Sequence, residues 1–120
     1  MRVYAHCTAG AANAKPGAVT VLVINLGSSH TNVSFAGAAA AGATRQFVIS
    51  PSANANASLT GQAGLMGTGA ELNGRPLVLG EGGAVPAIEG AAVEMPNSVR
   101  VPATSVAFYV LDNAEHPACK

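Results

Sequence analysis

Cysteine and histidine are the residues of this chain with the widest chemistry, because both can serve nucleophilic catalysis or bind a metal ion. The two cysteines, Cys7 and Cys119, stand near opposite ends of the 120 residues and lack the close spacing of a reactive pair. The three histidines, His6, His30 and His116, are far apart and show no metal-ligand spacing. His6 precedes Cys7, but neighbours on a strand point to opposite faces, which argues against a nucleophilic pair. The sequence predicts no metal site and no cofactor.

The carboxylates are the other candidate catalytic groups, and they are spread singly: Glu71, Glu81, Glu89, Glu94, Asp112 and Glu115. Three of them lie in glycine- and proline-rich stretches, one flanks a predicted hairpin, and two follow the last predicted strand. All six are therefore expected at the surface. A Ser-His-Asp triad needs placement by the fold, and the glycines form no phosphate-binding fingerprint. We predict no catalytic residue in this chain.

The two cysteines leave two interpretations open. A disulfide between them would close almost the whole chain into one loop, which the chain-entropy model values at roughly 4–5 kcal/mol. It would also imply an oxidising compartment. Two separate buried thiols are the alternative, and spacing alone does not decide between them.

Charge and hydropathy exclude several classes of protein. The six basic and six acidic residues balance, and no basic stripe suits a nucleic acid. No apolar run reaches the length of a membrane span. The residues after Met1, Arg2-Val3-Tyr4, already read as a strand, so we expect no signal peptide within this chain.

The elements that must position these residues read as strands. Residues 18–26 form a continuous β-branched run, and 31–35 alternate so that Val33 and Phe35 share a face. Only four residues separate these runs, which predicts a hairpin. Residues 44–50 read as a third strand, with Phe47 and Ile49 on one side, stopped by a proline.

The second half of the chain continues the pattern with turns between short strands. Residues 52–68 read as a loop with an apolar anchor at Leu65-Met66, and 71–79 as a hairpin that turns at Asn73-Gly74. A loop over 80–90, an interrupted edge strand within 93–101 and a strong strand over 104–111 follow. The alanine-rich stretch 36–43 is too short to nucleate a helix. We predict one all-β domain over 1–120, an antiparallel β-sandwich of seven to eight short strands.

Four blocks of the sequence, in order, resemble the C-terminal β-sandwich of the heparanases and their relatives in glycoside hydrolase family 79. They are Arg2-Val3-Tyr4-Ala5-His6-Cys7-Thr8, the strand from Gly17 to Leu26, Leu72-Asn73-Gly74-Arg75-Pro76-Leu77, and Pro102 to Val110 with Pro117-Ala118-Cys119. The middle of the chain, 37–69, matches weakly and is rich in alanine.

The resemblance implies that Cys7 and Cys119 pair, as the matching cysteines of the family do. It implies a secreted, lysosomal or vacuolar protein, in which the sequons at Asn32 and Asn56 are candidate glycosylation sites. It also implies a parent enzyme, a retaining endo-β-glucuronidase acting on glucuronic-acid-containing glycans. Its two catalytic glutamates, about 5 Å apart, come from a (β/α)₈ barrel that this chain lacks.

Three functional interpretations follow. The first is a non-catalytic supporting domain that packs against the barrel, with an apolar patch and an open sheet edge prone to weak self-association. The second is a free-standing carbohydrate- or protein-binding sandwich, which the absence of Trp and of basic clusters disfavours. Such a face would use exposed aromatics, and Tyr109 points outward if Phe108 points inward. The third is a fragment with no independent role.

Overall fold

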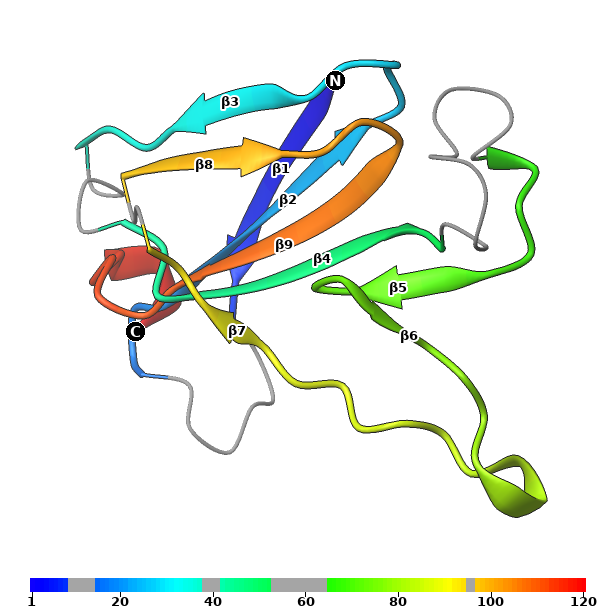
Figure 1. The fold of residues 1–120 in the computed structure, drawn as a ribbon. Coiled ribbons are helices and arrows are strands. Elements are labelled where there is room, and N and C mark those ends of the chain that lie inside the picture. The colour runs from blue at the N-terminus through cyan, green and yellow to red at the C-terminus, as the bar shows by residue number, and fades with distance from the viewer. Residues whose placement is uncertain (9–14, 38–41, 53–64, 95–96) are drawn as a thin grey trace.

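The computed structural model describes residues 1–8, 15–37, 42–52, 65–94 and 97–120, which form two antiparallel sheets (Figure 1). The larger sheet has the order β1 (Arg2–Cys7), β2 (Val19–Asn25), β9 (Ser105–Leu111), β4 (Arg45–Pro51), β5 (Ala70–Leu72), β6 (Arg75–Pro76), and β7 (Ala91–Ala92) also pairs with β4. The smaller sheet pairs β3 (Thr31–Ser34) with β8 (Ser98–Val101). The all-β class and its antiparallel sheets are as predicted.

The core lies between the two sheets, on what we call the inner face of the larger one. Strand side chains alternate between faces, so β9 turns Ala107, Tyr109 and Leu111 inward, and all three are fully buried. From β2, Val21 and Val23 join them. β3 and β8 cover this face from the other side, with Val99 and Val101 in the same core cluster.

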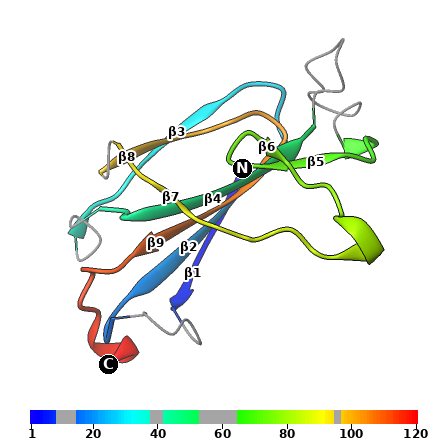
Figure 2. The same ribbon diagram turned by 60° about the horizontal axis from the view of Figure 1, so that its bottom comes forward.

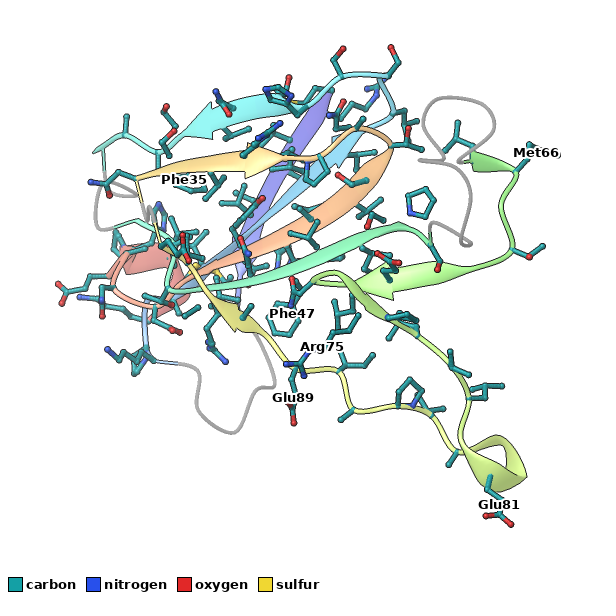
Figure 3. All side chains as sticks on the ribbon, viewed as in Figure 1. Phe35, Phe47, Met66, Arg75, Glu81 and Glu89 are labelled. Carbon is teal, nitrogen blue, oxygen red and sulfur yellow. A yellow bond between two sulfur atoms is a disulfide. The ribbon has the colours of Figure 1, made fainter. Side chains whose placement is uncertain are left out.

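Aromatic placement separates the two faces. The rings of Phe35 and Tyr109 meet edge to face, with centroids 6.1 Å apart, inside the sandwich. Figure 3 shows Phe47 on the other side of β4, away from Phe35 and the smaller sheet. Tyr109 is therefore the inward residue and Phe108 the outward one, so the outward Tyr109 considered for a sugar-binding face is wrong.

The expected hairpin between residues 18–26 and 31–35 is also wrong. β2 pairs with β1 and β9, whereas β3 pairs with β8 in the other sheet. The connection crosses between layers, held by the Asn25 amide, which donates to the carbonyls of Ser29 (2.9 Å) and Pro102 (2.8 Å). A strand that is apolar on both faces takes a central position, so β2 needs a neighbour on each side.

The remaining strand predictions are largely confirmed. β4 places Phe47 and Ile49 on one side and includes Pro51, which was expected to end it. The Asn73-Gly74 turn joins β5 and β6, with positive φ angles of 50° and 76°, as a primed two-residue turn requires. β6 is short, and residues 77–79 leave the sheet instead of extending the hairpin.

Two loop predictions need correction. Leu65 and Met66 are not an apolar anchor, because their side chains are 54% and 78% exposed. Of the edge strand predicted within 93–101, the structure has β8, at the edge of the smaller sheet; β7 lies before this range and belongs to the larger sheet. Within the described ranges, no helix is long and apolar enough to cross a membrane.

Candidate functional site

The outer face of the larger sheet carries two apolar rows that run across the strands. Register alignment puts Tyr4, Leu22, Phe108 and Phe47 in the first row. It puts Ile24, Val106, Ile49 and Leu72 in the second. Cross-strand neighbours contact one another, so each row is a continuous apolar ridge across four strands. We call these eight residues the outer rows.

Much of this apolar surface is open. Tyr4 is 50% exposed and Ile49 36%, and Leu22, Phe47 and Phe108 are each partly exposed. The smaller sheet lies against the inner face, so no described layer covers the outer rows (Figures 1 and 2). This is the apolar patch that a supporting domain is expected to present.

A hollow of about 320 Å³ lies where the outer rows meet the segment that follows β6. Its lining is apolar except for one threonine: Thr20, Phe47, Ile49, Leu72, Leu77, Ile88, Phe108 and Val110. Leu77 and Ile88 belong to residues 77–90, which we call the arm. The arm leaves the sheet at β6, turns at η2 (Glu81–Gly83) and returns to β7 (Figure 1).

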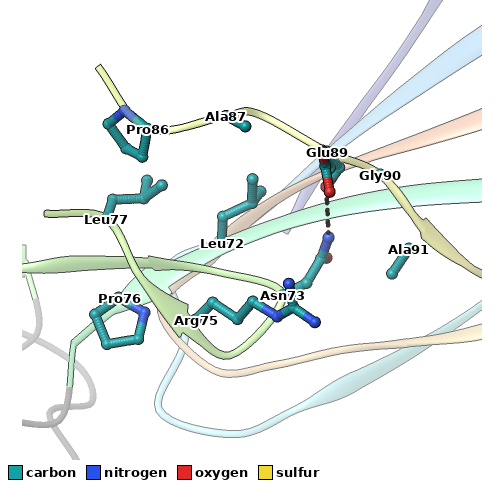
Figure 4. A pocket seen from close by; sticks show the side chains of 10 residues that line it. All are labelled: Leu72, Asn73, Arg75, Pro76, Leu77, Pro86, Ala87, Glu89, Gly90 and Ala91. Atoms are coloured by element: carbon teal, nitrogen blue, oxygen red, sulfur yellow. Dashed lines mark hydrogen bonds between the residues drawn. The ribbon is translucent and has the colours of Figure 1, made fainter. Parts of the chain in front are cut away.

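Asn73 fixes the base of the arm to the sheet. Its side-chain oxygen accepts from the Val48 amide at 2.9 Å, and its amide donates to the carbonyls of Gln46 (3.2 Å) and Glu89 (3.3 Å). β5 and β7 both pair with one edge of β4 and leave a gap between them, which Asn73 fills. Figure 4 shows the bond to Glu89 beside a second hollow of about 350 Å³ that Arg75 also lines.

Gly90 lets the arm return close to the outer rows. A Cβ at this position would lie 2.7 Å from the ring of Phe47. Glycine therefore lets the backbone cross this ring, and any larger residue would require the Phe47 ring to shift.

A polar corner lies at the end of the sheet where Arg45 of β4 pairs with β7. Asp112 accepts hydrogen bonds from the Thr44 hydroxyl (2.6 Å) and the Arg45 guanidinium (3.1 Å). Burial acts to raise the pKa of this carboxyl, but these two hydrogen bonds and the charges of Arg45 and Lys15 outweigh it and hold the pKa below 3.8. The expectation of a free surface charge at Asp112 is wrong, since its side chain is only 14% exposed.

The other carboxylates take no part in a common site. Glu71 is half-buried and accepts from the Ser52 hydroxyl at 3.3 Å. The remaining four are exposed, as predicted: Glu81, Glu89, Glu94 and Glu115. No cluster of three or more potential metal ligands occurs in the part of the chain that the structure describes.

The histidines make local structural contacts. His6 contacts the Cys7 carbonyl through its Nδ1, His116 accepts from the Ala118 amide, and His30 lies 3.1 Å from the Arg100 guanidinium. All three side chains are exposed and none lies in the outer rows.

A disulfide joins Cys7 at the end of β1 to Cys119 in η3 (Pro117–Cys119), with the Cα atoms 5.2 Å apart. Beside it, the Gly17 amide donates to the Cys119 carbonyl and the His116 amide to the Gly17 carbonyl, each at 2.9 Å. Together these bonds tie the C-terminal tail to the edge of the larger sheet.

Of the two sequons, Asn32 lies on β3 with an exposed side chain, on the side of the smaller sheet that faces solvent. Asn56 lies outside the described residues.

Comparison with known proteins agrees with this geometry. No family model matches the chain. Two curated relatives, named inactive heparanase-2, from mouse and human, are each 30% identical over 121 residues that cover all of this chain. Over its whole length the chain is similar to a heparanase-like C-terminal domain. It corresponds to the C-terminal portion of these relatives and spans 19% of their length.

The resemblance that four blocks of the sequence indicated is thereby confirmed over the whole length of this chain. Sequence reasoning did not locate the outer rows or the arm. A signal for the rows was present, because residues 18–26 are apolar at consecutive positions, as in a strand buried on both faces. A signal for the arm was the set of large apolar residues that end the predicted hairpin and continue into the predicted loop: Leu77, Val78, Leu79, Val85 and Ile88.

Proposed function

We propose that this chain is a non-catalytic supporting domain of a larger heparanase-like protein and that residues 1–120 form one domain of it. Its outer rows pack against the (β/α)₈ barrel of that protein. The observation that carries the proposal is the pair of apolar rows on a sheet whose other face is already covered. Two-layer packing leaves such a face to another domain.

The lengths of the relatives support this assignment. A chain that spans 19% of the inactive heparanase-2 proteins leaves room in a similar parent for a domain several times its size. Each large apolar side chain that becomes fully buried at such a contact contributes about 1.5–3 kcal/mol. Any retaining glucuronidase chemistry of the parent would belong to its barrel, since the carboxylates described here are scattered.

The disulfide and the exposed sequon support a secreted, lysosomal or vacuolar location. Asn32 is accessible to a glycosyltransferase and lies on the smaller sheet, opposite the outer rows. A glycan there would leave the proposed contact with the barrel free.

The test is a charge substitution in the outer rows of the full-length protein. Ile49→Asp and Tyr4→Asp place carboxylates where the side chains are already partly exposed, so the domain keeps its own fold. The control is Met66→Asp, at a position that is 78% exposed and outside the rows. We expect the first two to loosen the contact between the domains, measured as faster limited proteolysis of the intervening chain, and the control to have no effect.

Equal proteolysis rates for all three variants would contradict the proposal. Binding of a defined oligosaccharide to the outer rows of the isolated chain would favour the free-standing module instead.

A further inference from the structure

The arm is the most exposed apolar segment of the described chain. Val78, Leu79, Val85 and Ile88 are 69%, 64%, 76% and 58% exposed. Its two charged residues, Glu81 and Glu89, lie at the tip and at the base. Between them the arm offers apolar side chains to the surroundings, which is costly in water unless another surface covers them.

Backbone hydrogen bonds nevertheless define the conformation of the arm's tip. The Gly80 amide donates to the Ala84 carbonyl at 2.8 Å, and the Gly83 amide to the Gly80 carbonyl at 3.0 Å. The base is fixed by two hydrogen bonds. The Asn73 side-chain amide donates to the Glu89 carbonyl, and the Leu77 backbone amide donates to the Ala70 carbonyl at 2.9 Å. A segment fixed at both ends holds its apolar middle in a defined direction.

The two segments that lead to and from the tip of the arm, which we call its legs, do not form backbone hydrogen bonds with each other. Within residues 65–94, all of which are described, the structure shows no backbone hydrogen bond from the amides of Val78, Leu79 or Val85. The legs therefore do not form a hairpin with each other (Figure 1). An exposed apolar segment with free backbone groups has the character of a surface that docks on another chain segment.

The arm is continuous with the outer rows at the 320 Å³ hollow, where Leu77 and Ile88 line the same space as Phe47 and Phe108. No charged side chain lines this hollow. Its chemistry therefore suits an apolar side chain and not an ionic group.

We propose that the arm is a second docking element, and that the preceding region of the heparanase-like protein lays an apolar ridge between the arm and the outer rows. The inference rests on the proposed function. The occupant is the rest of the same protein because relatives continue for about four fifths of their length outside the matched part. The ridge places side chains in the hollow and covers the legs of the arm.

The experiment is hydroxyl-radical footprinting of the 120-residue chain and of the full-length protein that carries it. Labelling rates are read at the arm (Leu79, Val85, Ile88), at the outer rows (Tyr4, Phe47, Phe108) and at the control Met66. We expect labelling in the full-length protein to fall by about fivefold or more at the arm and the rows, as burial excludes the radical, with Met66 unchanged.

The other outcomes separate the two proposals. Protection of the outer rows without protection of the arm would overturn the inference and leave the proposed function in place. Equal labelling of both in the chain and in the full-length protein would overturn both. Protection of the arm that appears in the isolated chain as its concentration rises would assign the surface to a second copy and overturn the inference.

Discussion

The larger sheet has two apolar faces, and among the described residues only one of them lies under a second sheet. The inner face carries Val23, Ala107 and Tyr109 under the smaller sheet, each with 0% of its surface exposed. The outer face carries rows of similar chemistry, yet Tyr4 and Ile49 remain 50% and 36% exposed. Burial on the inner face specifies the fold, and the exposed outer face is where we propose that the rest of the heparanase-like protein packs.

The comparison also explains how individual strands of the larger sheet are held in place. β2 and β9 lie in the middle of the sheet and have apolar residues on both faces. β1 has no buried residue, so pairing with β2 and the disulfide at its end hold it in place. Because β1 carries Tyr4 of the outer rows, the disulfide supports the proposed docking face as well as the edge of the sheet.

A charged substitution on each face is expected to give the largest difference in the free energy of unfolding. Val23→Asp places a carboxylate in a fully buried apolar site and is expected to cost more than about 4 kcal/mol, which unfolds the chain. Tyr4→Asp, at a residue of the outer face that is 50% exposed, is expected to cost about 1 kcal/mol or less. Urea unfolding followed by circular dichroism measures both, and similar losses from both variants would contradict the distinction between the faces.

Breaking the disulfide tests the support of β1. Cys7→Ser with Cys119→Ser, or reduction of the wild-type chain, is expected to lower the free energy of unfolding by about 2–5 kcal/mol, because the bond closes a long loop. Thermal unfolding with and without reductant measures the loss. An unchanged melting temperature would show that β1 needs no covalent support.

Removing the Asn73 side chain tests the attachment of the arm. Asn73→Gly keeps the positive φ of the turn but leaves the Val48 amide without its acceptor, at a cost of about 1–3 kcal/mol. Hydrogen exchange at the Val48 amide and chemical unfolding measure the effect. Asn73→Asp keeps an acceptor for this amide and should retain part of the stability; no difference between the two variants would contradict the role of the Val48 bond.

The contribution of the polar corner to stability is expected to depend on pH. The folded-state pKa of Asp112 is held below 3.8, so its contribution is complete above that pH and is lost as the pH falls through the folded-state pKa. Asp112→Asn is expected to cost about 1 kcal/mol at pH 7, and the difference from wild type should vanish in acid. Glu115→Gln, at an exposed position, is the control. A difference that persists below the folded-state pKa would rule out the carboxylate as its source.

The smallest effect is expected at Tyr109. Its hydroxyl is buried without a hydrogen-bond partner among the described residues, and burial raises the pKa of Tyr109 to about 12. Tyr109→Phe removes the unpaired hydroxyl and is expected to raise stability by about 0.5–1 kcal/mol at pH 7.

The same substitution has an alkaline signature. Wild type should lose stability as the pH rises above 10, the ordinary pKa of an unfolded tyrosine, until the folded-state pKa is reached. Tyr109→Phe should lack this loss, and the exposed Tyr4→Phe should retain it. A destabilised Tyr109→Phe chain at neutral pH would show that the hydroxyl has a partner.

Local pattern predicted much of the fold. Alternation identified the shared face of Phe47 and Ile49, and the Asn73-Gly74 pair identified the β5–β6 turn, because both depend on a few adjacent residues. Pairing between distant strands was harder. The short spacing between β2 and β3 favoured a hairpin, whereas β2 pairs along its whole length with both β1 and β9 in the larger sheet.

The candidate site depended still more on long-range contacts. The outer rows combine residues of five strands from both ends of the chain, so no window of the sequence contains a whole row. The ion pair of Asp112 with Arg45 joins residues 67 apart, which is why Asp112 was read as a free surface charge. The resemblance to the heparanases predicted that an apolar patch exists, and only the register shows which residues form it.

The most direct test of the central claim is the mass of the protein isolated from its source, under native and then denaturing conditions. The account predicts that this sequence occurs within, or tightly bound to, a heparanase-like protein several times larger than 11.8 kDa, with Tyr4 and Ile49 protected from labelling. An 11.8 kDa monomer with both residues fully labelled would contradict it, because the outer rows would then face water.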